Sequence, residues 1–133
     1  MNIKSYFKND QFAALAGIEL VEAANGHAKA KMVLQPHHWN GIGTVHGGAL
    51  FTLADFAFAA ACNSHGTVAV AIDANITFMK WAKTGTLYAE ARELAKNFKL
   101  GSYSVEVRDD NGELIAQFQG LAYRKKDKWE DGD

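Results

Sequence analysis

The chain lacks the features that mark secreted, membrane-spanning or nucleic-acid-binding proteins. Its one cysteine, Cys62, cannot form an internal disulfide, which fits a reducing compartment. Its longest apolar run, Ala49–Cys62, is too short to span a bilayer and contains a carboxylate, Asp55. The N-terminus has no basic and apolar pattern of the secretory type. A net charge of −1 gives no reason to expect a nucleic acid or an anionic membrane as partner. These absences predict a soluble, cytoplasmic protein.

What the chain does contain indicates one globular domain. Its 133 residues can form a single hydrophobic core, and 48% hydrophobic with 22% charged residues is ordinary for such a domain. No internal repeat or low-complexity linker divides the chain. Residues 125–133 have the composition of a polar, solvated tail. Residues 1–17 are expected to carry an N-terminal helix over Ser5–Ala16, with one side formed by Phe7, Phe12, Leu15 and Ala16.

Two Asn-Gly dipeptides, Asn25-Gly26 and Asn111-Gly112, predict hairpin turns, because both residue types tolerate positive φ values. The segments that flank the first turn alternate largely between apolar and polar residues, as strands with one wet face do. A further long strand is indicated by a run rich in Val, Ile and Thr. The expected strands are Ile18–Ala24, His27–Leu34, Thr67–Phe78, Ser102–Asp109 and Glu113–Arg124.

Two other segments decide the architecture. Residues His46–Asn63 are apolar nearly all round and contain no proline, which predicts a buried helix. Leu87–Phe98 fits both a helical stripe and an alternating strand pattern, and its residue types favour a helix when the segment is taken alone. The order of elements leaves one sheet and one helix shielded from water. The simplest α+β solution wraps the sheet around that helix.

Three short motifs resemble the N…HGG…LAD signature of the hotdog-fold acyl-CoA thioesterases of the phenylacetate-degradation type: Asn40, His46-Gly47-Gly48 and Leu53-Ala54-Asp55. The segment Asp73–Phe78 and several later residues are also similar to that family, so the likeness extends roughly from Ile18 to Arg124. The resemblance implies a single hotdog domain over residues 1–133, in which an antiparallel sheet wraps a long helix and Leu87–Lys96 is a strand. It also implies hydrolysis of acyl-CoA thioesters to free acid and CoA. Coenzyme A is then part of the substrate, and no metal or other cofactor is expected.

Gly47 and Gly48 stand where a helix begins, and this position suits an oxyanion. The first backbone N–H groups of a helix have no partner inside it and lie at the positive end of its dipole. Glycine lets a ligand oxygen approach without meeting a Cβ. A thioester carbonyl oxygen, which becomes negative during attack, fits such a donor, which is typically worth roughly 3 kcal/mol of barrier. The glycines can instead serve only to let the helix pack closely on the sheet.

Asp55 is the most informative single residue, because an ionised carboxylate in apolar surroundings is costly unless it is paired, solvated or functional. It can attack the thioester carbon itself, giving a mixed anhydride, or activate a water molecule as a general base. An isolated Asp would usually be a capped or solvent-facing residue. Its place in the LAD motif favours a catalytic role here.

Gly47 and Asp55 cannot serve the same substrate from one helix. Eight residues of helix separate them by about 12 Å of rise and about 80° of rotation, whereas nucleophile and oxyanion donor must both lie roughly 3 Å from one reacting centre. Two antiparallel helices related by a twofold axis can bring Asp55 of one subunit near Gly47 of the other. The resemblance implies the same homodimer with two composite sites, associated further as a dimer of dimers.

The resemblance also assigns supporting roles. Asn40 is expected to orient the attacking water or the thioester, although a turn residue before Gly41 is the plainer interpretation. His46 is expected to shape the loop and the carbonyl site rather than to act as a base. Substrate contacts are expected at four residues, with aromatic rings for the acyl group and a lysine for the CoA phosphates: Gly48, Phe51, Phe78 and Lys80. Core packing and surface solubility are the ordinary roles of such rings and lysines.

Other chemistries have less support. His37-His38 has no carboxylate or cysteine at ligand spacing, so no metal site is predicted. Ser64-His65 lacks the context of a nucleophile elbow, so no serine triad is predicted. Some relatives carry a hydroxyl residue two positions before the aspartate that corresponds to Asp73, where this chain has Ala71, which puts the efficiency of turnover in question.

Two other functions remain open at this point. A non-catalytic protein that binds acyl-CoA or an acyl carrier would keep the pocket without efficient chemistry. A hotdog dehydratase or hydratase is disfavoured, because the HGG…LAD motif resembles the thioesterase pattern instead. The sequence does not identify the acyl group, and both aryl and medium-chain groups fit.

Overall fold

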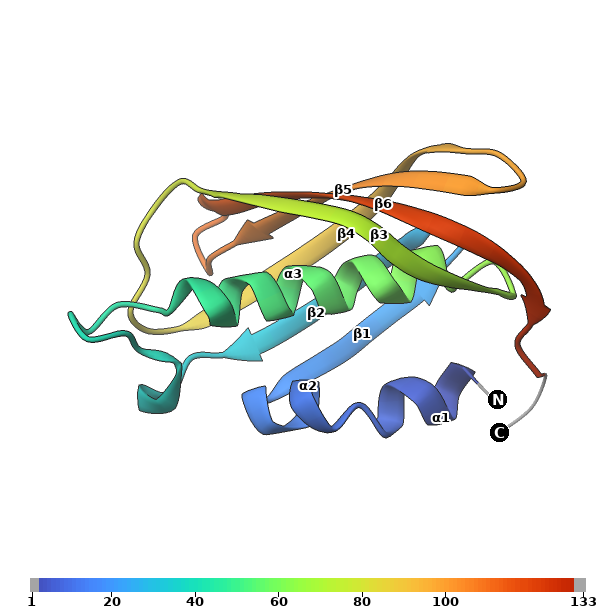
Figure 1. Ribbon diagram of the computed structural model, residues 1–133. Coiled ribbons are helices and arrows are strands. Elements are labelled where there is room, and N and C mark those ends of the chain that lie inside the picture. The colour runs from blue at the N-terminus through green and yellow to red at the C-terminus, as the bar shows by residue number, and fades with distance from the viewer. Residues whose placement is uncertain (1–2, 131–133) are drawn as a thin grey trace.

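The computed structural model describes residues 3–130 and shows one antiparallel sheet curved around a central helix (Figure 1). The strands lie in the order β1-β2-β4-β5-β6-β3. Their bounds are β1 Ile18–Ala24, β2 His27–Val33, β3 Thr67–Phe78, β4 Thr86–Lys96, β5 Leu100–Arg108 and β6 Leu114–Lys128. The helices are α1 Ile3–Lys8, α2 Gln11–Ala16 and α3 Gly47–Cys62, with a short 3-10 helix, η1 Pro36–His38. This is the α+β arrangement, a sheet wrapped around a long helix, that the sequence predicts.

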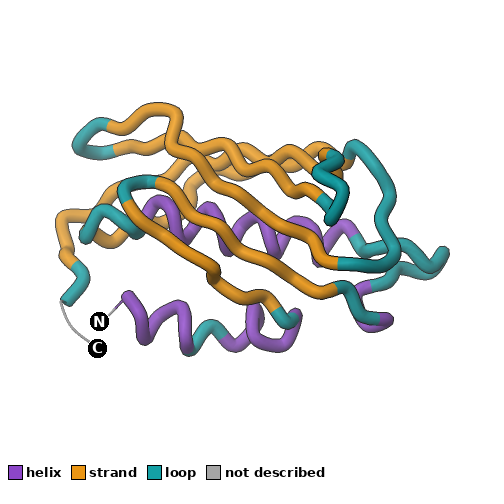
Figure 2. The backbone as a smooth tube through the Cα atoms, turned by 180° about the vertical axis from the view of Figure 1, so that it is seen from behind, coloured by secondary structure: helices purple, strands orange, loops and turns teal. Residues whose placement is uncertain are grey.

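Helix α3 forms the centre of the core. Most of its side chains are buried, and the small ones among them let the strands approach closely. The ring of Phe58 lies under β6, where a Cβ on Gly120 would come within 2.7 Å of it, so only glycine leaves room there. Phe58 also packs edge-on against Tyr103 of β5, with ring centroids 5.5 Å apart. Burial of each such side chain contributes roughly 1.5–3 kcal/mol. Seen from behind, the strands form one layer in front of α3 (Figure 2).

The first predicted hairpin is confirmed. Asn25 and Gly26 have φ values of 52° and 82°, and both signs suit the tight turn that connects β1 to β2. The strands pair from Ile18 opposite Met32 to Ala24 opposite His27. The β5–β6 hairpin is also present, although its connection is longer than the Asn111-Gly112 dipeptide alone.

The ambiguous segment Leu87–Phe98 is a strand over most of its length. In β4 the residues Leu87, Ala89 and Ala91 point to the core and are buried, while Tyr88 and Arg92 lie on the outer face. Tertiary pairing with β2 and β5 on both sides overrides the local helical preference.

The prediction of a single helix over Ser5–Ala16 is wrong, because the helix is interrupted between α1 and α2. Asp10 caps the second helix, where its side chain accepts a hydrogen bond of 3.0 Å from the Ala13 N–H. The residues of the predicted apolar side also differ in burial. Phe7 packs against α3, but Phe12 and Leu15 are 69% and 80% exposed.

The polar tail is structured for longer than its composition predicts. Strand β6 continues through Lys128, four residues past Arg124, and the Trp129 N–H donates to the Gly66 carbonyl at 2.9 Å. Residues 131–133 of the predicted tail, like residues 1–2, lie outside the described part of the chain. Within residues 3–130, no helix is long and apolar enough to cross a membrane.

Candidate active site

The loop before α3 is organised by Asn40. Its Oδ1 accepts hydrogen bonds from the N–H groups of Ile42 and Thr44, at 3.0 and 3.2 Å, and its Nδ2 donates to Thr44 Oγ1 at 3.0 Å. The loop is also tied to the segment after β3, because the Val45 N–H donates to the Ala82 carbonyl at 2.8 Å. Asn40 therefore has the turn role that its position allows. Among the described residues, one of its two amide hydrogens has an acceptor, and the other remains available to a ligand.

His46 caps the start of α3. Its Nδ1 accepts a hydrogen bond of 2.8 Å from the Gly48 N–H, and its own N–H donates to the His38 carbonyl at 2.7 Å. Since Nδ1 is an acceptor, a neutral His46 carries its proton on Nε2. The Ala49 N–H is also used, by the His46 carbonyl. Within residues 3–130, the Gly47 N–H is left without an acceptor at the positive end of the α3 dipole.

Gly47 lines a hollow of about 290 Å³ on the surface. A Cβ on Gly47 would come within 3.0 Å of Phe78 Cζ, so the Phe78 ring lies directly against the glycine. Lys80 lies at the rim and pairs with Glu113, and both side chains are half exposed. The hollow thus brings together four residues that the sequence singles out: Asn40, Gly47, Phe78 and Lys80.

Gly48 and His46 face a different hollow, of about 260 Å³, which includes the exposed Phe12 and Leu15 of α2. A Cβ on Gly48 would meet His46 Nδ1 at 3.0 Å, so this glycine gives room to the cap. Phe51 lines neither hollow. It packs edge-on against Phe118 of β6, with ring centroids 5.4 Å apart, as a residue at the margin of the core.

Asp55 lies on the one stripe of α3 that the sheet leaves partly open. Thr52, Asp55 and Ala59 follow each other at helical spacing and are half-buried, whereas Ala54 and Phe56 are buried. The Asp55 carboxylate has no hydrogen bond or ion pair with any described residue. Burial, and then the nearby negative charge of Asp10, raise the pKa of Asp55 above its usual range.

The structure confirms that Gly47 and Asp55 belong to one uninterrupted helix and shows them at different places on the surface. In a single copy of the chain, the free N–H and the open carboxylate do not meet at one hollow. Sequence reasoning missed other residues near each of them. Thr44, Val45 and Leu50 line the Gly47 hollow, and the negative charge of Asp10 contributes to the raised pKa of Asp55. Only the capping preference of Asp10 is visible in the sequence.

The histidines and serine that were set aside have structural contacts. His38 is buried, with Nδ1 accepting from the Gln35 N–H and Nε2 2.6 Å from the Ala16 carbonyl oxygen. Ser64 Oγ accepts from the Gly26 N–H and donates to the Ala61 carbonyl. No group of three or more potential metal ligands occurs in the described part of the chain.

Comparison with known proteins gives a consistent answer. Residues 42–116 match the Thioesterase superfamily, and this range holds Asp55 and every lining residue of the Gly47 hollow except Asn40. Acyl-coenzyme A thioesterase PaaI of Escherichia coli is 36% identical over 124 residues, which cover 92% of this chain and 89% of that protein. Human acyl-coenzyme A thioesterase 13 is 38% identical over 120 residues, 86% of each chain.

The fold comparison agrees with these sequence matches. The structure of the E. coli PaaI protein superimposes with a TM-score of 0.91 at 34% identity, and the match covers 97% of this chain and 94% of that chain. The hotdog fold and the resemblance inferred from the motifs are therefore confirmed. This chain belongs to the thioesterase superfamily.

Proposed function

We propose that the protein hydrolyses acyl-CoA thioesters to the free acid and CoA. The observation that carries this function is the Gly47 N–H, which has no acceptor among the described residues and faces a hollow at the positive end of α3, in a member of the thioesterase superfamily. Relatives at 36% and 38% identity are named acyl-coenzyme A thioesterases, which supports acyl-CoA as the substrate.

In the proposed reaction the thioester carbonyl oxygen accepts a hydrogen bond from the Gly47 N–H. As a general base, Asp55 takes a proton from water while the water oxygen bonds to the thioester carbon. The resulting oxyanion is held by Gly47 until the C–S bond breaks, and the CoA thiolate takes the proton from Asp55. As a nucleophile, Asp55 would instead displace CoA directly, and water would then hydrolyse the mixed anhydride. Both routes need only groups of the chain itself and no cofactor.

The raised pKa of Asp55 suits the general-base route. A carboxylate that holds its proton more tightly than usual is a stronger base at neutral pH than an ordinary aspartate. Asn40 and His46 support the site by holding the loop and the first turn of α3 in place. Phe78 forms the wall against which the substrate enters, and Lys80 is placed at the rim for the CoA phosphates.

The complete site is proposed to form in a homodimer, because Gly47 and Asp55 of one chain lie at different places. Strand β3 is hydrogen-bonded to β6 on one side and is an edge strand on the other. Its exposed Val70 and Ile72 are unusual for an edge that faces water. Pairing of two β3 strands about a twofold axis would set the α3 helices antiparallel, so that each Asp55 approaches the partner subunit's oxyanion site. A further association of two dimers is compatible with the same arrangement.

A cytoplasmic location is proposed on the basis of Cys62, a buried free thiol on α3.

The test is the release of free thiol from a panel of acyl-CoA substrates. Asp55→Asn is expected to lower kcat at least 100-fold, within the usual range for a positioned base or nucleophile, and to leave substrate binding nearly unchanged. Wild-type turnover by this variant would eliminate the mechanism. Tight binding of acyl-CoA with no thiol release by the wild type would favour the alternative function, an acyl-CoA or acyl-carrier binding protein.

A further inference from the structure

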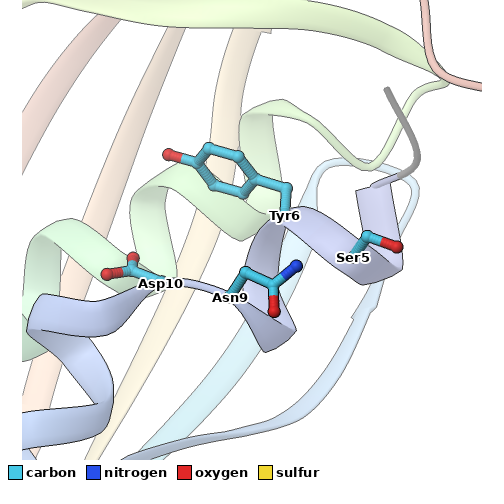
Figure 3. Close-up of a pocket in the computed structure, with 4 residues that line it drawn as sticks. All are labelled: Ser5, Tyr6, Asn9 and Asp10. Atoms are coloured by element: carbon cyan, nitrogen blue, oxygen red, sulfur yellow. The ribbon is translucent and has the colours of Figure 1, made fainter.

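The short helix α1 separates two hollows of different character. One side of α1 faces a polar hollow of about 340 Å³, lined by Ser5, Tyr6, Asn9 and Asp10 (Figure 3). The opposite side faces a groove of about 710 Å³ between α1 and the edge strand β1, which reaches Phe56 of α3. This groove is more than twice as large as the hollow beside Gly47 and shares no lining residue with it.

The walls of the groove are apolar and come from α1, β1 and α3. Phe7 packs edge-on against Phe56, with ring centroids 5.4 Å apart, and this contact ties α1 to the central helix. Ile18 and Phe56 are buried, whereas Leu20 is 38% exposed. The apolar residues that line the groove are Ile3, Phe7, Ile18, Leu20, Ala23 and Phe56. A concave and mostly apolar space of this size is typical of small-molecule sites, which hold about 300–1,000 Å³.

Three polar side chains line the groove, and two of them are already engaged. Ser64 Oγ accepts one backbone hydrogen bond and donates another, both of 2.7 Å. Glu19 pairs with Lys31 of β2, with 3.8 Å between oxygen and nitrogen, so its charge is balanced. Lys8, the last residue of α1, has no hydrogen bond or ion pair with any described residue. The side chains of the groove therefore offer an apolar wall and one free positive charge.

This inventory determines which ligand chemistry fits. A sugar or a nucleotide brings several polar groups, and an apolar wall would leave most of them without partners at a cost in free energy. An aliphatic carboxylic acid has a long apolar chain and a single anionic end. Its chain can lie along the wall while its carboxylate meets the Lys8 ammonium at the rim.

The irregular edge of β1 argues against a peptide in the same place. A peptide that adds to a sheet edge forms a regular series of backbone hydrogen bonds. Strand β1 carries a bulge between Leu20 and Glu22, in the stretch that borders the groove. A bulge interrupts the regular pairing that an added strand needs.

We propose that the groove between α1 and β1 binds a fatty acid, with the alkyl chain against Phe7, Leu20 and Phe56 and the carboxylate at Lys8. The groove is separate from the Gly47 hollow, so this inference goes beyond thioester hydrolysis and does not depend on it. A free acid is also what the proposed hydrolysis releases, so the ligand belongs to the same chemical class as that product.

Calorimetric titration of the full chain with decanoate, and with its neutral counterpart 1-decanol, tests the assignment. Decanoate is expected to bind saturably, and shorter acids should bind more weakly, by up to about fourfold for each methylene group lost from the groove. Lys8→Gln should weaken decanoate binding roughly two- to fivefold and leave decanol binding unchanged. Lys99→Gln removes an exposed lysine between β4 and β5 and should change neither affinity.

Two neighbouring residues of β1 give a matched pair of variants for the wall. Leu20→Asp places a charge in the apolar groove and should weaken the binding of both decanoate and decanol at least about tenfold. Val21 is 54% exposed and does not line the groove, so Val21→Asp should bind both ligands as the wild type does. Ala23→Phe fills the groove from an exposed position and provides the same test if Leu20→Asp does not fold.

Several results would overturn the proposal. A wild type that does not bind decanoate, or undiminished binding by Leu20→Asp and Ala23→Phe, would remove the site. Equal effects of Lys8→Gln on decanoate and decanol would remove the role of the carboxylate, and with it the fatty acid as ligand.

Other occupants of the groove give different patterns. A non-hydrolysable decyl-CoA thioether should bind Leu20→Asp as well as it binds the wild type, and a loss equal to that of decanoate would assign the groove to the acyl tail of a substrate instead. A changed oligomeric state of Leu20→Asp with unchanged decanoate affinity would assign it to a second copy of the chain. None of these measurements depends on thiol release, so a failure of the proposed function would not affect them.

Discussion

Adjacent glycines at the start of α3 have different tasks. The Gly48 N–H is used by the His46 cap, and a Cβ on Gly48 would press on that imidazole at 3.0 Å. The Gly47 N–H has no acceptor within residues 3–130, and a Cβ there would press on the outer end of the Phe78 ring, also at 3.0 Å. Neither glycine has a positive φ, so both positions are selected for space and not for backbone strain.

Gly47→Ala should therefore separate catalysis from stability. Alanine is the better helix former, and the exposed Phe78 ring can move aside, so the melting temperature should stay close to that of the wild type. The added methyl crowds the thioester oxygen against its donor, and kcat should fall roughly 10- to 100-fold. Steady-state kinetics and a thermal melt of the same sample measure both effects.

Two related variants serve as controls. Gly48→Ala should lower the melting temperature more than Gly47→Ala does, because it displaces the cap. In Gly47→Ala combined with Phe78→Leu, the ring no longer opposes the methyl group. Full recovery of the rate by this double variant would show that Phe78, and not the oxyanion, was disturbed.

The pKa of Asp55 gives a prediction for stability. A carboxylate with a raised pKa in the folded state binds its proton more tightly there than in the unfolded chain, so its contribution to stability is present at low pH and is lost as pH rises through the folded pKa. Asp55→Asn should therefore raise the melting temperature at pH 7 to 8, and this gain should shrink as the pH is lowered toward 4. A gain that is constant from pH 4 to 8 would show that burial does not penalise the charge.

Local residue chemistry made the two proposed catalytic residues visible in the sequence. A carboxylate within an apolar run and a pair of glycines at a helix start are each costly or unusual, so Asp55 and Gly47 stand out without a structure. The packing of Phe7 in α1 against Phe56 in α3 could not be found in this way, since nothing near Phe7 in sequence shows that α1 folds back on the middle of α3.

Among the elements, those with one dominant pattern were predictable. The first hairpin turn and the uniformly apolar helix appear where the sequence puts them. Strand β4 was not predictable from its own residues, because alanine and leucine positions in it satisfy the helical and the strand period together. Pairing on both sides decides its form, and that information lies in β2 and β5. The break between α1 and α2 was missed because Asp10 caps the second helix within a continuous helical pattern.

Asn63 joins helix α3 to strand β3 and to the C-terminal segment. Its Nδ2 donates to the carbonyls of Ala59 and Ala69, at 2.8 and 3.1 Å, and its Oδ1 accepts from the Ala69 N–H and from Trp129 Nε1, at 2.8 and 3.1 Å. The side chain is almost fully buried. Asn63 thus fixes the start of the edge strand β3 relative to the end of α3.

Removal of this side chain should be costly, because several buried partners would lose their hydrogen bonds together. Asn63→Ala should lower the free energy of unfolding by about 2–4 kcal/mol in urea titrations. The exposed Asn97, which accepts from the N–H groups of Lys99 and Leu100, is the matched control, and Asn97→Ala should cost about 1 kcal/mol or less. Equal losses in the two variants would refute the bridging role of Asn63.

The whole molecule leaves the β3 edge of its sheet without a partner and carries the two proposed catalytic groups, Gly47 and Asp55, at different places. Strand β3 has a partner on one side only, and the stripe that carries Asp55 is the part of α3 that the sheet does not cover. Both features are explained by one proposal, a second copy of the chain placed by a twofold axis along β3. Activity should then depend on the dimer, since a single copy holds only half of each site.

Mixing two inactive variants tests this arrangement directly. Asp55→Ala lacks the carboxylate of both sites in its homodimer, and Gly47→Leu blocks the oxyanion donor of both. A mixed dimer combines both defects in one site and leaves the other site intact, so activity should return on subunit exchange. Equal amounts that reassort at random make about half of the dimers mixed, each with one working site of two, so the ceiling is roughly a quarter of wild-type activity. Native mass spectrometry establishes whether mixed dimers have formed. Mixed dimers without activity would mean that Gly47 and Asp55 do not serve one substrate across the interface.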